Sequence, residues 1–134
     1  FFLFAAVCGI AGALAFMLVR WGEVVPMVGA SGAISGLMAA GFRLLLPTIA
    51  NGDFHEMRES PRTVRLATVG ECFQSRRMLF AIIAFVVVNF LVAFAAPVLT
   101  DAAGIAWEAH LGGFAAGLLL LGVFDLRQPA DAIT

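Results

Sequence analysis

The chain has 134 residues, of which 62% are hydrophobic and 13% charged, whereas an ordinary soluble domain is roughly half apolar and a quarter charged. Its net charge is −1 and it contains no lysine, so it lacks the basic surface that binds a phosphate backbone. The composition excludes an ordinary soluble protein, makes nucleic acid an unexpected partner, and points to lipid as the surroundings of this chain.

Four apolar stretches approach the ~20 residues that are needed to cross a bilayer. In chain order they are about residues 1–19, 28–49, 79–97 and 105–124. The first and third carry no charge, and the second carries only Arg43, whose long side chain is expected to reach the membrane interface. The fourth holds Glu108 and His110 near its start. We therefore expect an all-α, polytopic transmembrane bundle that forms a single membrane domain over residues 1–134.

The distribution of arginine predicts how this bundle is oriented. The polar segment of residues 50–78 contains five arginines, and with Arg43 and Arg127 it places seven of the eight on one side. An excess of arginine in short loops marks the cytoplasmic side of a membrane. We expect an integral protein of a bacterial inner membrane, with the 50–78 loop and the C-terminus in the cytoplasm.

A serine opens the second apolar stretch, within the sequence Gly-Ala-Ser-Gly of residues 29–32. The small neighbours of Ser31 leave room for a substrate backbone, and the free N–H groups at a helix start suit a developing oxyanion. The alternative is purely structural, because Gly32 and Gly36 form a small-x-x-x-small pattern that lets membrane helices pack closely. Ser31 is therefore a candidate nucleophile that needs a partner.

His110 is the candidate partner, since an imidazole within a spanning helix is costly and is a functional hypothesis by default. Gly113 and Gly117 follow it on the same helix face and allow a close approach to a neighbouring helix. The second and fourth spans both enter from the outer side, so Ser31 and His110 share a depth in the membrane. The alternative is a buried structural histidine, bonded to a backbone carbonyl or to Ser35.

Two other polar groups lie near these candidates. Glu108 is two residues before His110, where side chains point away from each other, and it is expected to meet water at the outer rim. Asn89 is a lone amide in the third span and is expected to make an interhelical hydrogen bond.

The two motifs together resemble those of rhomboid intramembrane serine proteases: Gly-Ala-Ser-Gly at residues 29–32 and Ala-His-Leu-Gly-Gly at residues 109–113, followed by Gly117. The resemblance covers nearly the whole chain and implies the third to sixth helices of a six-helix core. Because the chain begins at Phe1 within hydrophobic sequence, we expect an N-terminal part to be missing. The site residues that the resemblance implies are a dyad of Ser31 as nucleophile and His110 as general base, with Gly29, Gly32, Gly113 and Gly117 for the oxyanion backbone and close packing.

The resemblance also implies the substrates, which are single-span transmembrane proteins cut near the outer membrane surface without a cofactor. The sequence departs from the family in two ways. No His-x-x-x-Asn motif is present to help bind the oxyanion, so either the chain is truncated or the oxyanion site is incomplete. In addition, Ser35 stands where many members have an aromatic residue. A catalytically inactive rhomboid-like protein that binds transmembrane helices is therefore the alternative function.

Other catalytic classes fit less well. The sequence at residues 55–59 has a glutamate where the metalloprotease motif His-Glu-x-x-His needs its second histidine, so no metal site is expected. Asp53 has no second aspartate within a span to form a carboxylate pair. Cys8 and Cys72 have neither the spacing nor the companions of a disulfide framework or a zinc site.

Overall fold

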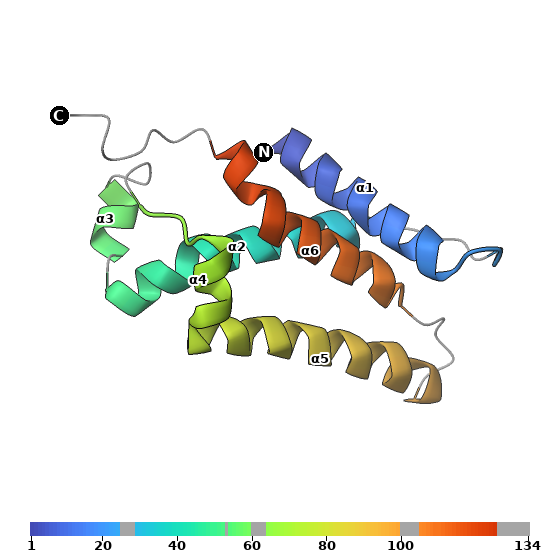
Figure 1. The fold of residues 1–134 in the computed structure, drawn as a ribbon. Helices are drawn as coiled ribbons and strands as arrows, with labels where there is room; N and C mark the ends of the chain where they lie inside the picture. Colours follow the sequence, from blue (N-terminus) through green and yellow to red (C-terminus); the bar gives the residue numbers. More distant parts are fainter. Residues whose placement is uncertain (25–28, 53, 60–63, 100–104, 126–134) are drawn as a thin grey trace.

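Six helices make up the fold of this protein in a computed structural model, which describes residues 1–24, 29–52, 54–59, 64–99 and 105–125 (Figure 1). They are α1 (Phe2–Val19), α2 (Ser31–Asn51), α3 (Phe54–Glu59), α4 (Val69–Gln74), α5 (Arg76–Leu99) and α6 (Trp107–Phe124). Asp53 and Arg127, which entered the sequence predictions, lie outside the described residues.

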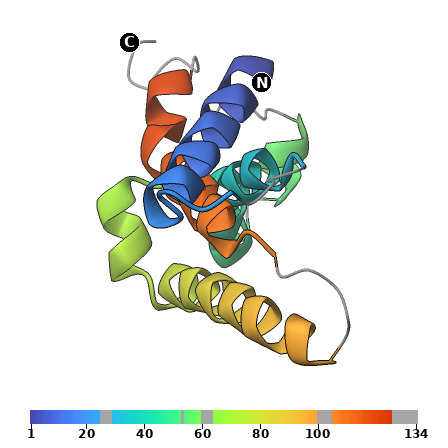
Figure 2. The same cartoon turned by 90° about the vertical axis from the view of Figure 1, so that its right-hand side faces the viewer.

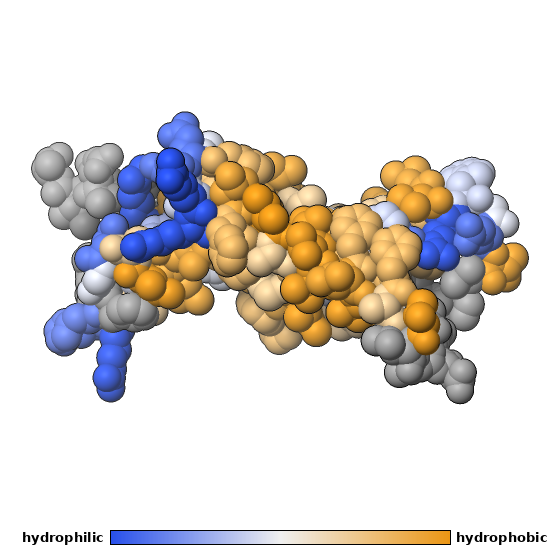
Figure 3. Space-filling view, turned by 90° about the horizontal axis from the view of Figure 1, so that it is seen from below, coloured by the Kyte–Doolittle hydropathy of each residue, from blue (hydrophilic) through white to orange (hydrophobic). Residues whose placement is uncertain are grey.

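Four of these helices are long and apolar enough to cross a membrane, over Phe2–Val19, Ser31–Asn51, Arg76–Ala95 and Trp107–Phe124. Figure 3 shows a hydrophobic band between two hydrophilic ends on one face of the molecule. The expected all-α bundle with four spanning helices is thus confirmed. The segment of residues 50–78 holds α3, α4 and the start of α5, which begins at Arg76.

Glycines bring α1, α2 and α6 into backbone contact (Figure 2). A Cβ atom on Gly113 would lie 2.9 Å from the Cα of Gly32, and one on Gly117 would lie 2.6 Å from the Cα of Gly36. A Cβ on Gly36 would in turn collide with the side chain of Cys8 on α1. Because ordinary contacts of a Cβ atom begin near 3.4 Å, no larger residue fits at these positions without moving a helix.

Helix α5 lies on the far side of α6 from α1, and aromatic rings attach it there (Figures 1 and 2). The rings of Phe85 and Phe114 are stacked with their centroids 4.1 Å apart, and those of Phe90 and Trp107 are 4.8 Å apart. Phe90 follows Phe85 on α5, whereas its partner Trp107 precedes Phe114 on α6. They therefore fix the register of an antiparallel helix pair.

Arg43 is buried, with 4% of its surface exposed, so the expectation that it would reach the membrane interface was wrong. Its Nε donates to the carbonyl of Ala67 at 2.8 Å, and its Nη1 donates to that of Leu118 at 2.7 Å. These carbonyls belong to the segment before α4 and to α6. The guanidinium stays inside because it joins three parts of the chain through hydrogen bonds.

A proline explains why that segment docks on α2. Pro47 lies inside α2 and has no N–H, so it cannot donate to the carbonyl of Arg43 four residues earlier. The N–H of Ala67 donates to this carbonyl instead, at 3.1 Å. Arg43 and Ala67 are consequently joined by two hydrogen bonds of opposite direction.

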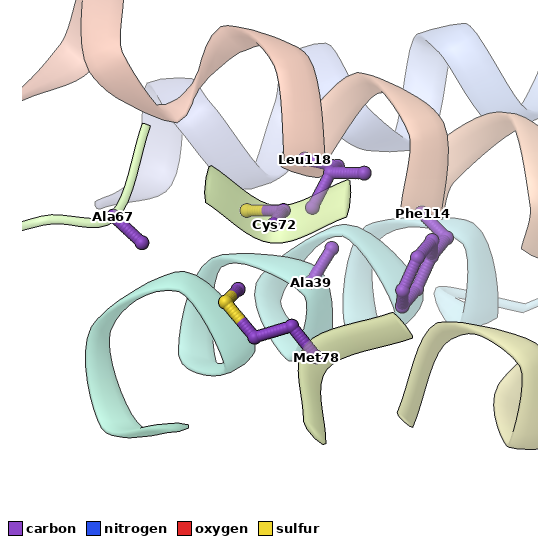
Figure 4. Close-up of a cluster of buried hydrophobic side chains, with 6 residues drawn as sticks. All are labelled: Ala39, Ala67, Cys72, Met78, Phe114 and Leu118. Atoms are coloured by element: carbon purple, nitrogen blue, oxygen red, sulfur yellow. The ribbon is translucent and has the colours of Figure 1, made fainter. Parts of the chain in front are cut away.

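Helix α4 begins with a capping box, in which the Thr68 hydroxyl accepts from the N–H of Glu71 and the Glu71 carboxylate accepts from the N–H of Thr68. Hydrogen bonding to Thr68 holds the pKa of Glu71 below its usual value. Helix α4 places the side chain of Cys72 in a hydrophobic cluster beneath α6 (Figure 4). Its buried members are Ala39, Ala67, Cys72, Met78, Phe114 and Leu118.

Candidate active site

Ser31 is the first residue of α2, and the backbone before it turns at a glycine. Gly29 has a φ of +118°, a backbone conformation that residues with a side chain rarely adopt. Among the described residues beyond its chain neighbours, none has an atom within 4 Å of the place where a Cβ of Gly29 would be. The positive φ of Gly29 therefore requires the conformational freedom of a glycine. Gly32, by contrast, faces the other helices directly.

The backbones of α1, α2 and α6 converge beside the two candidate catalytic residues. A Cβ atom on Gly32 would lie 3.2 Å from the carbonyl oxygen of Ala109, and one on Gly12 would lie 2.6 Å from the same oxygen. Ser31 precedes Gly32 and His110 follows Ala109. The serine and the histidine therefore belong to neighbouring positions at the same end of α2 and α6.

Ser31 and His110 are both partly exposed, and no hydrogen bond joins the serine hydroxyl to the imidazole. Catalytic hydrogen bonds are often long or poorly aligned before substrate binds, and they tighten in the complex. The helix ends that carry Ser31 and His110 therefore lie next to each other, but the two side chains are not hydrogen-bonded.

The imidazole instead contacts α5, where its Nδ1 lies 2.7 Å from the Oδ1 of Asn89. Asn89 is 7% exposed, and its Nδ2 donates to the Phe85 carbonyl at 2.9 Å. The expected interhelical hydrogen bond of Asn89 is present, but the sequence did not identify His110 as its partner. Ser35, the other candidate partner of His110, is buried and makes no hydrogen bond to it.

Glu108 is buried, with 2% of its surface exposed, so the expectation that it would meet water at the rim was wrong. Its Oε1 accepts from the Nε of Arg20 at 2.7 Å, and its Oε2 has no hydrogen-bond partner among the described residues. This hydrogen bond and the carboxylate charge raise the pKa of Arg20. The ion pair closes the end of the bundle that carries Ser31 and His110 by joining α6 to the end of α1.

Loss of Arg20 would leave the Glu108 carboxylate buried without a counter-charge. We expect Arg20→Gln to lower the unfolding temperature, and the double variant Arg20→Gln/Glu108→Gln to recover part of the loss because no buried charge remains. Thermal unfolding in detergent measures both effects. Glu23→Gln is the control, since the Arg20–Glu23 pair is solvent-exposed and exposed pairs contribute little. Equal destabilisation by Glu23→Gln would contradict the prediction.

No group of three metal-ligating side chains occurs within the described ranges. His55, in the sequence compared with a metalloprotease motif, is exposed on α3 and lies 3.4 Å from Glu59. Cys8 and Cys72 are buried and free. The candidate reacting groups at the end of the bundle that carries Ser31 and His110 are the serine hydroxyl, the imidazole and the backbone N–H groups at the start of α2.

Comparison with known protein families gives a match to the Rhomboid domain over residues 1–127. No curated protein shows a significant match to the chain, and no solved structure does. The matched range includes every helix described above.

Proposed function

The chain belongs to the rhomboid family, and on this basis we propose that it is an intramembrane serine endopeptidase with Ser31 as nucleophile and His110 as general base. Rhomboid proteins are in general serine proteases that act within membranes on transmembrane substrates. The family and the four long apolar helices together make this chain an integral membrane protein.

The observation that carries the proposal is the close approach of Gly32 to Ala109. It supports the dyad because each of these residues is the chain neighbour of one candidate, so Ser31 and His110 each lie one residue away from the same contact between α2 and α6. Gly113, one turn after His110 on α6, supports it further, since its lack of a side chain lets α6 touch the backbone of Gly32, the residue after Ser31.

In the proposed reaction, the Ser31 hydroxyl attacks a peptide carbonyl while the Nε2 of His110 takes its proton. The protonated imidazole then gives that proton to the leaving amine, and an ester to Ser31 remains. His110 next activates a water molecule that hydrolyses the ester and releases the acid. These steps need one neutral imidazole and no acidic third residue.

The start of α2 offers donors for the oxyanion. The N–H of Ile34 donates to the carbonyl of Ala30 at 3.0 Å and begins the helical ladder, so the N–H groups of residues 31–33 precede it. They lie at the positive end of the helix dipole. We assign the N–H of Ser31 as the principal donor within this chain.

The proposed substrates are single-span membrane proteins. A regular helix hides its carbonyls in internal hydrogen bonds, so a substrate must unwind locally before attack. From the arginine distribution, we propose that the loop of residues 50–78 and the C-terminus face the cytoplasm. We further propose that the membrane is a bacterial inner membrane and that cleavage takes place near its outer surface.

The second candidate function is a catalytically inactive rhomboid-like protein that binds transmembrane helices. The observation that favours it is the missing hydrogen bond between Ser31 and His110, whose imidazole is bonded to Asn89. A serine-reactive fluorophosphonate separates the two functions, because it labels only an activated serine.

We expect the protein in lipid vesicles to be labelled by a fluorophosphonate at Ser31, which peptide mass spectrometry identifies. Labelling should disappear in Ser31→Ala and fall at least 100-fold in His110→Ala, since general base catalysis contributes about 10² to 10⁴ in rate. Ser35→Ala and His55→Ala are the matched controls, and both should retain labelling. Absence of labelling in the folded parent protein would favour the inactive binder.

A further inference from the structure

We propose that Asn89 is a positioning residue that holds His110 in the tautomer with its proton on Nδ1, leaving Nε2 free to act as the base. The catalytic part of this inference rests on the proposed dyad of Ser31 and His110. The structural part, the tautomer itself, does not depend on catalysis.

The orientation of the Asn89 amide follows from its second hydrogen bond. The Phe85 carbonyl is only an acceptor, so the group that contacts it at 2.9 Å must be the NH₂ of Asn89. The amide oxygen then faces His110, at 2.7 Å from Nδ1. Flipping the amide would place two oxygens against each other at Phe85, and a donor against the imidazole.

An amide oxygen only accepts, so the ring nitrogen that it contacts must carry the hydrogen. In a neutral imidazole the other nitrogen is then unprotonated. That nitrogen is Nε2, the atom that must take the proton of Ser31. The hydrogen bond therefore selects the tautomer that is competent for base catalysis.

The surroundings of the Asn89–His110 hydrogen bond strengthen its preference for the tautomer that is protonated on Nδ1. Asn89 is nearly excluded from solvent, so water competes weakly for its oxygen. The ring pairs Phe85–Phe114 and Phe90–Trp107 lie on either side of this hydrogen bond along the two helices. They keep the register in which Asn89 faces His110. Helix α5 thus acts on the candidate site through one side chain without contributing a reacting group.

The tautomer can be measured by nitrogen NMR of ¹⁵N-histidine-labelled protein in lipid vesicles. In the His55→Ala background, His110 is the single histidine, and at pH 8 a ring of ordinary pKa (~6.5) is neutral. We expect one signal set in which Nδ1 is protonated and Nε2 is not. Asn89→Ala should shift the population toward the tautomer protonated on Nε2, and Asn89→Asp, which keeps an acceptor, should restore the parent pattern. A parent protein already protonated on Nε2, or an unchanged pattern in Asn89→Ala, would overturn the inference.

The rate of fluorophosphonate labelling at Ser31 tests the catalytic part. Asn89→Ala should slow it about tenfold, the equivalent of one hydrogen bond, and Asn89→Asp should recover most of the rate. Val88→Ala, at an exposed neighbouring position on α5, is the control and should leave the rate unchanged. An unchanged rate in Asn89→Ala contradicts the positioning role. If the parent protein is not labelled but the tautomer shift occurs, the proposed protease function fails while the tautomer assignment stands.

Discussion

Replacing Gly117 with alanine is expected to prevent α2 and α6 from packing as they do in this structure. The added Cβ atom would lie 2.6 Å from the Cα of Gly36, and the atoms that it meets are backbone, which has no side-chain rotation to relieve the clash. The carbonyl oxygen of Gly36 would lie closer still, so the two helices must separate, which breaks contacts along their shared face. We expect a loss of about 3 kcal/mol in the free energy of unfolding, the upper part of the usual range for overpacking. Unfolding in mixed micelles of increasing SDS content, followed by circular dichroism, measures it.

Gly122→Ala is the matched control on the same helix. Among the described residues that its added Cβ would meet, the nearest atom is the Nη2 of Arg43 at 3.8 Å, an ordinary contact, so the unfolding midpoint should stay near that of the parent. Equal unfolding midpoints of the two variants would contradict the prediction that the contact between Gly117 and α2 determines the stability of the helix pair. Fluorophosphonate labelling of Gly117→Ala should also be lost, because the same helix pair carries Ser31 and His110.

Replacing Arg43 with methionine is expected to detach the segment before α4 from the bundle. Methionine fills a similar volume but donates no hydrogen bond, so the buried carbonyl of Ala67 loses the partner at 2.8 Å. An unsatisfied buried acceptor costs about 1–3 kcal/mol, and the hydrogen bond to Leu118 is lost as well. We expect lower stability, and limited proteolysis at residues 64–68 that the parent protein resists. Mass spectrometry of the cleavage products locates the cuts.

Arg58→Met provides the comparison, since Arg58 is exposed on α3 and its removal leaves no buried acceptor. It should change neither the unfolding midpoint nor the cleavage pattern. Arg43→Lys should fall between the two, because one ammonium group cannot reproduce the fork of a guanidinium that reaches two carbonyls. A parent-like Arg43→Met variant would contradict the structural role of this arginine.

The sequence predicts the membrane architecture well, because hydrophobic length alone decides whether a helix can span a bilayer. It also pointed to Gly113 and Gly117, since a missing side chain in a spanning helix is most often explained by a close neighbour. The pairing of Ser31 with His110 remains a prediction that rests on the family and on the contact between the chain neighbours of these residues.

The expectations for two charged residues were wrong because their partners lie far away in the sequence, where a local pattern does not reveal them. Glu108 was expected in water because its side chain points away from that of His110 near the outer end of the span, yet Arg20, 88 residues earlier, pairs with it inside the bundle. Arg43 was expected at the interface because it lies near a helix end, but the carbonyls of Ala67 and Leu118 hold it inside. Asn89 was recognised as an interhelical donor or acceptor. Only the register of α5 against α6 shows that its partner is His110.

The proline within α2 has a consequence for the biogenesis of the protein. While the chain is being synthesised, the carbonyl of Arg43 cannot be paired by its own helix, and its partner Ala67 is made 24 residues later. Until then, a second helix within the membrane carries an unpaired acceptor, and its arginine lacks the Ala67 carbonyl as a partner; both oppose stable insertion. We therefore expect stable insertion of α2 to depend on synthesis of the segment that follows it, so that the two reach their final positions together.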